Sequence, residues 1–194
     1  MSYCLGLTGS IGMGKTTTAA MFAARGVPVW DADQTVHRLY QGAAVEPMRA
    51  AFPDCIVDGI VSRESLRAMI AANPAILDRI QSIVHPLIAI DRAQFITTAT
   101  APIILLDLPL LFEIGGEQLC DGVVVVTAPA EVQRARVLAR GQMTAEQFEI
   151  ILSRQIPDAE KCARADWVIE TTTLADAETK VGQVLTEIKE ILNA

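Results

Sequence analysis

The segment from Gly9 to Thr16 constrains this chain more than any other. It reads Gly-Ser-Ile-Gly-Met-Gly-Lys-Thr and fits the spacing G-x-x-x-x-G-K-[S/T] at every fixed position. An apolar run typical of a strand, Cys4–Thr8, precedes it, and residues 15–25 read as a helix. Glycines between a strand and a helix let backbone N–H groups turn toward phosphate oxygens, and the helix start adds a positive dipole end. The pattern predicts a phosphate-binding loop for a nucleoside triphosphate.

Two side chains of this loop have expected roles of their own. Lys15 is expected to reach the β and γ phosphates, and the Thr16 hydroxyl is expected to be a ligand of Mg²⁺. A chance glycine-rich turn is one alternative, but the neighbouring strand and helix argue against it. A dinucleotide-binding fingerprint is another, formed by Gly12-x-Gly14 and an acid within 31–33. It would need a third glycine where Thr17 stands and would leave the lysine unexplained.

The composition limits the class of protein. The chain has 194 residues, of which 51% are hydrophobic and 20% are charged, which suits one folded domain and excludes a disordered chain. A net charge of −7 argues against nucleic acid as the main partner, because an acidic surface repels phosphate backbones. No signal peptide or membrane-spanning run is evident. We therefore expect a cytoplasmic protein with no membrane partner, and the sequence indicates no oligomeric state.

Strands alternate with helices along the chain, and this order predicts the fold. Two continuous apolar runs, Ile103–Leu106 and Gly122–Val126, are typical of strands that are buried on both faces. Shorter strands are expected at Val29–Trp30 and Trp167–Ile169, and Thr144–Gln147 matches a capping box that begins a helix. The alternation predicts an α/β fold with a doubly wound, five-stranded parallel sheet.

Residues 41–100 differ from the rest of the chain. They contain three helical segments and no convincing central strand. Pro74 suits a helix start, and His85–Pro86 is expected to end or kink a helix. A histidine beside a proline is more often structural than catalytic. We interpret this region as a helical substrate-binding insert between the second and third strands of the sheet.

The absence of further motifs narrows the class of phosphate-loop protein. The chain has no Asn-Lys-x-Asp motif of the kind that reads guanine, and it is short for a large ATP-driven motor. A small-molecule kinase remains. Such a kinase needs an acid beside the acceptor hydroxyl, cationic charge over the transferred phosphoryl group, and a site for the acceptor.

Acids follow two expected strands at the edge where open parallel sheets bind ligands. Asp31 and Asp33 lie at the end of the second strand, and one of them is a candidate general base, with N-capping of the next helix by Asp33 as an equal alternative. Asp107 ends the third strand, which is the pattern of an acid that holds Mg²⁺ directly or through water. Its alternative role is to cap the following loop.

Arginines supply the expected cationic charge. Arg134, Arg136 and Arg140 share one expected helix, and Arg154 lies in the next one. A mobile lid that carries arginines would cover the phosphates, exclude water and stabilise charge in the transition state. An ordinary solvated arginine face is the alternative for each of them.

Together these motifs resemble those of the dephospho-CoA kinase family, from about Leu5 to Val184. The D-A-D, H-P-L and P-L-L-F-E segments of the family make this resemblance far more specific than the phosphate loop alone. The similar segments here are Leu7–Thr16, Val29–Asp33, Ile83–Leu87, Asp107–Glu113, the helix with Gln133, Arg136 and Arg140, Gln155–Pro157, and Ala165–Ile169.

The resemblance implies a P-loop kinase fold and transfer of the γ-phosphoryl group of ATP to the ribose 3′-hydroxyl of dephospho-CoA, with Mg²⁺. It implies that Asp33 is the base and that Lys15 and Arg140 stabilise the transferred group. The residues implied for the nucleotide are Gly9, Gly12, Met13, Gly14, Lys15, Thr16, Thr17 and Gln155. Those implied for the acceptor are Asp33, His85, Leu111 and Arg136, and those for the metal are Thr16 and Asp107.

The resemblance also implies a division of the single domain. The nucleotide-binding core would comprise residues 1–40, 100–128 and 160–194, the CoA-binding insert 41–99, and the lid region 129–159. Three positions depart from the common family pattern: Gly141, Ile151 and the turn Glu170–Thr173. The turn lies near the expected adenine site, so recognition of the base is expected to differ in detail.

Two rival functions remain open at this point. One is a kinase on the same core with another small-molecule or nucleotide acceptor, which an acceptor screen would identify. The other is a nucleotide-binding regulatory protein without transfer activity, which would bind ATP tightly and turn over no acceptor.

Overall fold

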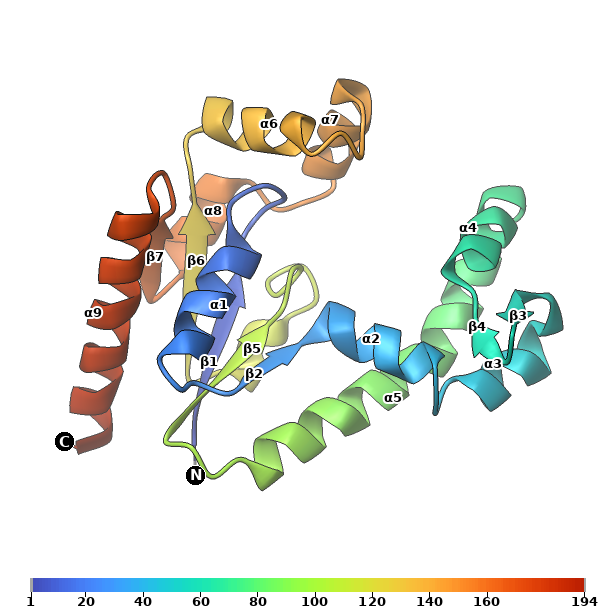
Figure 1. Ribbon diagram of the computed structural model, residues 1–194, viewed down its shortest axis with the longest axis horizontal. Helices are drawn as coiled ribbons and strands as arrows, with labels where there is room; N and C mark the ends of the chain where they lie inside the picture. The colour runs from blue at the N-terminus through green and yellow to red at the C-terminus, as the bar shows by residue number, and fades with distance from the viewer. Residues whose placement is uncertain (1, 194) are drawn as a thin grey trace. The chain divides into compact units, whose positions relative to one another are not determined.

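The computed structural model describes residues 2–193, which form two compact units (Figure 1). The first unit contains the chain up to Trp30 and the chain from Ala99 onward, and the second unit is Asp31–Thr98. Each unit has a hydrophobic core of its own. No helix within residues 2–193 is long and apolar enough to cross a membrane.

The elements of the first unit alternate between strand and helix. They are β1 (Tyr3–Thr8), α1 (Lys15–Ala24), β2 (Val29–Asp31, which leads into the second unit), β5 (Ile103–Asp107), η2 (Gly116–Leu119), β6 (Gly122–Thr127), α6 (Ala130–Ala139), α7 (Ala145–Ser153), α8 (Asp158–Arg164), β7 (Trp167–Glu170) and α9 (Leu174–Asn193). The capping box at Thr144 is present and begins α7. Helix α8 had no counterpart among the expected elements.

The strands form one sheet in the order β2-β5-β1-β6-β7. Strand β1 pairs in parallel with β5 and β6, and β6 pairs in parallel with β7. All residues of β5 and the first five of β6 are buried, as their continuous apolar sequences predict. The predicted α/β fold with a five-stranded parallel sheet is confirmed.

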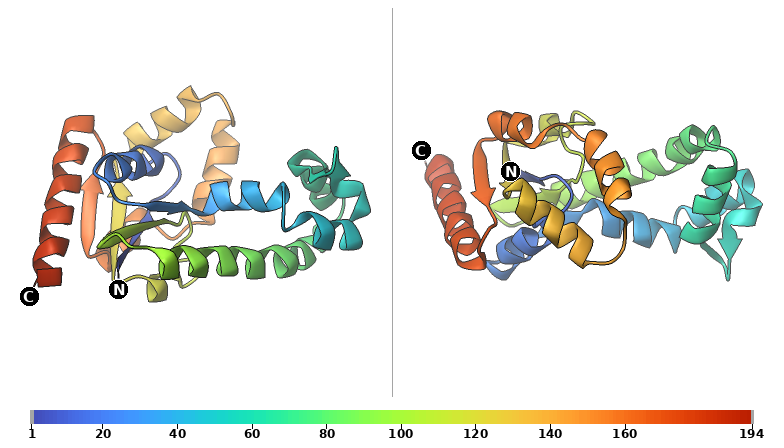
Figure 2. Two further views of the ribbon diagram at one scale, coloured as in Figure 1. Left: turned by 60° about the horizontal axis from the view of Figure 1, so that its bottom comes forward. Right: turned by 90° about the horizontal axis from the view of Figure 1, so that it is seen from above.

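Helices cover the sheet on both faces. Leu5 and Leu7 of β1 pack in one core with residues of α1 and α9. Gly6, between them, faces the other way, where a Cβ atom would lie 2.7 Å from Leu111 Cδ1 and from Cys120 Sγ. Figure 2 shows α1 and α9 on one side of the strands and α8 on the other. This arrangement is the expected double winding.

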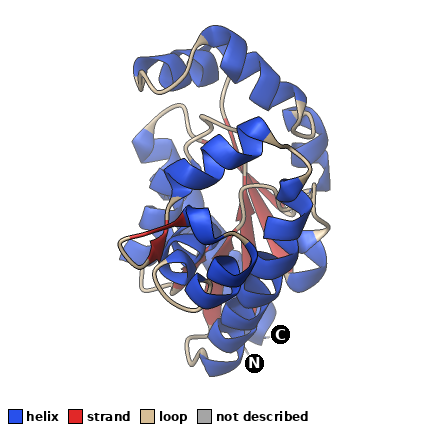
Figure 3. Ribbon diagram, turned by 90° about the vertical axis from the view of Figure 1, so that its right-hand side faces the viewer, coloured by secondary structure: helices blue, strands red, loops and turns tan. Residues whose placement is uncertain are grey.

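The second unit is mostly helical, as expected, but it also contains a hairpin. Its elements are α2 (Ala32–Tyr40), α3 (Val45–Ala51), η1 (Pro53–Cys55), β3 (Ile56–Val57), β4 (Ile60–Val61), α4 (Arg63–Ala72) and α5 (Ile76–Thr98). Strands β3 and β4 pair in antiparallel fashion (Figure 3). The two residues between them, Asp58 and Gly59, have positive φ angles of 50° and 79°, which is the backbone of a tight hairpin turn.

The sequence predicts that His85–Pro86 ends or kinks a helix, and the first of these two alternatives is wrong. Helix α5 continues from Ile76 to Thr98 with Pro86 inside it. A proline removes one helical hydrogen bond, but apolar side chains pack into the core of the second unit on both sides of it, Ile80 and Val84 before and Leu87 after. This packing outweighs the local preference of the proline.

Candidate active site

The phosphate loop connects β1 to α1 in the first unit. Gly12 and Gly14 have φ angles of 81° and 90°, a left-handed backbone that favours glycine. A Cβ atom on Gly12 would also lie 2.5 Å from Val137 Cγ2 of α6. The loop therefore needs glycine here for both its turn and its close approach to α6, and α1 begins directly after it at Lys15.

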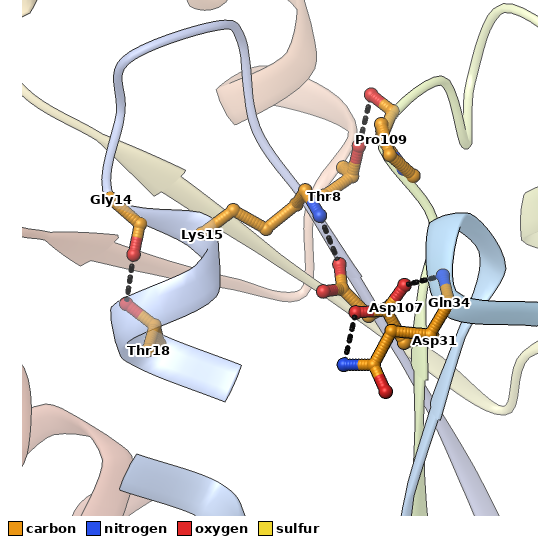
Figure 4. Close-up of polar contacts among 8 residues, drawn as sticks. All are labelled: Thr8, Gly14, Lys15, Thr18, Asp31, Gln34, Asp107 and Pro109. Atoms are coloured by element: carbon orange, nitrogen blue, oxygen red, sulfur yellow. Dashed lines mark hydrogen bonds and ion pairs between the residues drawn. The ribbon is translucent and has the colours of Figure 1, made fainter. Parts of the chain in front are cut away.

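Lys15 and Asp107 meet beside this loop. The Lys15 Nζ lies 2.5 Å from Asp107 Oδ1, and the two side chains are 17% and 3% exposed (Figure 4). The parallel register explains the meeting, because Leu7 of β1 pairs with Asp107 at the end of β5. The loop that follows is tied back by the Thr8 hydroxyl, which donates to the Pro109 carbonyl at 3.3 Å. A buried carboxylate and its counter-cation thus lie at the carboxyl ends of the central strands.

The hydroxyl groups of the first turn of α1 differ in their surroundings. Thr16 and Thr17 are exposed, so their side chains are accessible to a ligand. Thr18 is buried, and its hydroxyl donates to the Gly14 carbonyl at 3.2 Å. Within residues 2–193 no group of three or more His, Cys, Asp or Glu side chains could hold a metal ion.

Two glutamines hold the peptide groups of Ile11 inside the loop. Gln155 Oε1 accepts a hydrogen bond from Ile11 N at 3.1 Å, and Gln133 Nε2 donates to the Ile11 carbonyl at 2.7 Å. The predicted nucleotide-binding residue Gln155 therefore contacts the loop backbone. No role had been inferred for Gln133, because neither contact is local in sequence.

Thr171 joins the loop to the arginine helix, which is α6 with Arg134, Arg136 and its C-cap Arg140. Its hydroxyl lies 2.8 Å from the Met13 carbonyl and accepts a hydrogen bond from Arg136 Nη1 at 2.9 Å. Arg136 Nη2 donates to the Thr171 carbonyl at 2.6 Å. These contacts fall within the turn Glu170–Thr173, where the sequence departs from the family pattern, so that turn has a defined structural role here.

A pocket of about 380 Å³ adjoins the loop in the first unit. It gathers two groups of predicted residues: Gly14 and Thr17 from the loop, and Arg136 and Arg140 from the arginine helix. Thr171, Leu174 and Ala177 complete its wall. Arg140 is exposed at the end of α6. The pocket therefore has a cationic rim and an apolar wall.

Not every predicted cation lies at this pocket. Arg134 forms a surface ion pair instead, with its Nη1 2.5 Å from Glu149 Oε1 of α7. This matches the alternative of an ordinary solvated arginine.

Leu111, predicted to touch the acceptor, is fully buried under the sheet at Gly6. Its side chain has no exposed surface to offer, so the structure gives that prediction no support.

Asp33 lies in the second unit, in the first turn of α2. Its side chain is exposed. The N-cap of α2 is Asp31, whose Oδ1 accepts a hydrogen bond from Gln34 N at 2.9 Å (Figure 4). N-capping by Asp33, the alternative left open by the sequence, is therefore wrong, because the preceding aspartate already fills the cap position.

The second unit has a pocket of about 330 Å³ between α2, α4 and α5. His85 lines it together with Tyr40, Arg63 and Arg67 and with apolar side chains, among them Leu66. Burial raises the pKa of Tyr40, against the smaller opposing effect of Arg63. The phenol is therefore neutral and can donate a hydrogen bond. Two arginines beside an apolar wall suit a ligand with both anionic and apolar parts.

Comparisons with known proteins match the chain to one protein family. The family model described as dephospho-CoA kinase matches residues 3–176. A dephospho-CoA kinase of Ruegeria pomeroyi is 56% identical over 191 residues, which is 97% of each chain. One from Cereibacter sphaeroides is 54% identical over 192 residues, 98% of each chain.

Solved structures show the same fold. A Thermus thermophilus protein of known crystal structure superposes with a TM-score of 0.84 at 33% identity, covering 96% of this chain and 97% of that one. A dephospho-CoA kinase from Campylobacter jejuni has a TM-score of 0.73 at 24% identity and covers 98% of each chain.

Proposed function

The chain belongs to the dephospho-CoA kinase family, and on this premise we propose how its residues carry out the family's reaction. The γ-phosphoryl group of ATP passes to the ribose 3′-hydroxyl of dephospho-CoA and gives coenzyme A and ADP, the last step of coenzyme A biosynthesis. The observation that carries the assignment of residues is the meeting of Lys15 and the buried Asp107 carboxylate beside the phosphate loop. Phosphoryl transfer is catalysed mainly by positioning and by electrostatic stabilisation, and these are the groups it uses.

Lys15 and Asp107 exchange partners when ATP binds. The ammonium and the carboxylate neutralise each other at 2.5 Å. With ATP present, the ammonium turns to the β and γ phosphates, and the carboxylate becomes available as an oxygen ligand. Asp107 and the exposed Thr16 hydroxyl would then hold Mg²⁺, which prefers such oxygen donors. When bound, the metal ion would neutralise charge on the phosphates.

The pocket beside the loop receives the remainder of the nucleotide. Gly12, Met13, Gly14 and Thr17, together with Gly9 at the loop's start, form the phosphate cradle. The apolar wall at Leu174 suits the adenine ring. Arg140, exposed on the rim, stabilises the charge that develops on the transferred group.

Asp33 acts as the general base. Its carboxylate accepts the proton of the 3′-hydroxyl as that oxygen attacks the γ phosphorus and ADP leaves with the electrons of the broken bond. Two observations support this role. The Asp33 side chain is exposed, and Asp31 rather than Asp33 caps α2, so the Asp33 carboxylate is not needed for the helix cap.

The pocket of the second unit binds the acceptor. Dephospho-CoA combines an anionic pyrophosphate with a long arm of apolar and amide groups. Arg63 and Arg67 suit the pyrophosphate, and the apolar wall with Leu66 suits the arm. His85, on the pocket wall, is the predicted acceptor contact that this pocket retains, beside Asp33 as the base.

We also propose a division of the chain into three regions. They are a core of residues 1–40, 100–128 and 160–194, an insert of residues 41–99 and a lid region of residues 129–159. Protection of residues 129–159 from hydrogen exchange on addition of ATP and dephospho-CoA would support lid closure, and unchanged exchange there would contradict it. We also place the enzyme in the cytoplasm with its two small-molecule substrates.

The decisive experiment measures ADP release by the purified protein with Mg·ATP, with and without dephospho-CoA, and detects coenzyme A by mass in the same tubes. Equal amounts of ADP and coenzyme A are expected. ADP without coenzyme A would indicate another acceptor, which a screen of shikimate, gluconate and nucleoside monophosphates would identify. ATP binding without turnover would indicate a regulatory protein.

A further inference from the structure

A buried ion pair lies outside the phosphate loop and has no part in the proposed chemistry. Lys161 of α8 has a fully buried side chain, and its Nζ lies 2.7 Å from Oε1 of Glu113, which is 14% exposed. A lysine is almost never fully buried unless it is paired, because removing an ammonium from water is costly. A charge pair kept in this place therefore calls for an explanation.

Glu113 connects two segments that are far apart in the sequence. It follows β5 and Asp107, and its Oε1 also accepts a hydrogen bond from Ile156 N at 3.1 Å, in the connection between α7 and α8. Burial acts to raise the pKa of Glu113, but the Lys161 ammonium and hydrogen bonds from backbone N–H groups outweigh it and lower the pKa. The carboxylate is thus charged and holds the α7–α8 connection from one side.

The same connection contacts the phosphate loop on its other side. Gln155 precedes Ile156, and its Oε1 accepts a hydrogen bond from Ile11 N at 3.1 Å. The Ile11 carbonyl is held independently by Gln133. A continuous series of contacts therefore runs from Lys161 through Glu113, the 155–156 backbone and the Gln155 side chain to the loop.

We propose that Lys161 and Glu113 are positioning residues for ATP: their ion pair fixes residues 155–156 so that Gln155 holds the phosphate loop in its binding shape. Neither residue touches the substrate in this role. The inference rests on the proposed function of the loop. The positioning role differs from a purely structural one in a measurable way: loss of the ion pair weakens ATP binding and leaves the KM for the acceptor unchanged.

The test uses the full chain with Lys161→Met, Glu113→Gln and the double variant. Lys161→Met leaves a buried carboxylate unpaired, and we expect the Kd for Mg·ATP, measured by calorimetry on folded protein, to rise about tenfold or more. The KM for dephospho-CoA should stay within about twofold. The double variant has no unpaired charge and keeps an amide oxygen for Ile156 N, so its Kd should return to within about threefold of the wild-type value.

Two further variants complete the design. Lys189→Met removes an exposed lysine of α9 and serves as the matched control, with an expected unchanged Kd. Gln155→Leu leaves the ion pair intact and should raise the Kd for Mg·ATP as much as Lys161→Met does. If Lys161→Met does not fold, Gln155→Leu still tests the proposal.

Three results would overturn the inference. They are an unchanged Kd for Mg·ATP in folded Lys161→Met, an unchanged Kd in Gln155→Leu, and an equal rise of the Kd for Mg·ATP and the KM for dephospho-CoA in Lys161→Met. Failure of the wild-type protein to bind Mg·ATP would instead refute the proposed function, so the two failures are distinguishable.

Discussion

One hydroxyl group, that of Thr171, joins three segments of the first unit, and Thr171→Val isolates its contribution. The group lies 2.8 Å from the Met13 carbonyl and 3.2 Å from the Thr127 carbonyl, and it accepts a hydrogen bond from Arg136. Thr171 is 6% exposed, so water cannot readily replace the lost partner. Valine keeps the shape of the side chain, and the change therefore removes polar contacts with little loss of packing.

The structure gives the size of the effect. The Met13 carbonyl loses a buried donor, which costs about 1–1.5 kcal/mol. Arg136 loses one of two hydrogen bonds but keeps the one to the Thr171 carbonyl at 2.6 Å. We assign about 0.5–1 kcal/mol to that loss. The free energy of unfolding should fall by about 1.5–2.5 kcal/mol, which for a chain of this length lowers Tm by about 3–10 °C.

Thermal unfolding followed by circular dichroism measures this shift. Thr186→Val is the matched control, because the exposed Thr186 hydroxyl donates only to the Gly182 carbonyl one turn earlier in α9. Its Tm should change by about 1–2 °C or less, as for most surface substitutions. Equal shifts in the two variants would show that the Thr171 hydroxyl does not stabilise the junction of loop and arginine helix.

Three further predictions concern charged residues. Asp33→Asn should lower kcat about 10²-fold and leave the Kd for ATP unchanged. Asp31→Ala should mainly lower the free energy of unfolding, by about 0.5–2 kcal/mol, because the cap of α2 is lost. If Asp33→Asn keeps a kcat within a few-fold of wild type, Asp33 is not the base. Lys15→Ala should abolish phosphoryl transfer, and robust activity would contradict the assignment of the loop. The pKa of Glu113 in the folded chain lies below its ordinary value of 4.5. The ionised carboxylate therefore stabilises the fold at pH values above 4.5. This stabilisation is lost as the pH falls through the lowered pKa. The Tm difference between wild type and Glu113→Gln should therefore shrink on acidification, and a constant difference would refute this linkage.

The strands of the sheet could be predicted because each carries its own signal. Strands β5 and β6 are uninterrupted apolar runs, and the phosphate loop fixes where β1 ends and α1 begins. The hairpin of the second unit was missed although Asp58-Gly59, between two β-branched pairs, is the sequence of a tight turn. Two-residue strands give too short a pattern to stand out among helices.

The supporting contacts of the site could not be predicted from the sequence. Lys161 lies in a short helix among charged residues and has the pattern of a solvated side chain, yet it is fully buried. Gln133 and Gln155 reach Ile11 across a long separation in the chain, which no local spacing reveals. The residues that bear the chemistry sit in local motifs, whereas those that hold the motifs in place are defined only by the fold.

The pairing of β1 has a consequence for how the chain folds as it is synthesised. Strand β1 is synthesised before its partners β5 and β6, so Tyr3 cannot pair until Ile103 has been made. The second unit has its own core and is made entirely within that interval. Its helices can therefore form while an apolar strand, Tyr3–Thr8, still lacks both neighbours. During that interval the nascent chain exposes an unpaired apolar strand, which is the kind of segment that promotes aggregation.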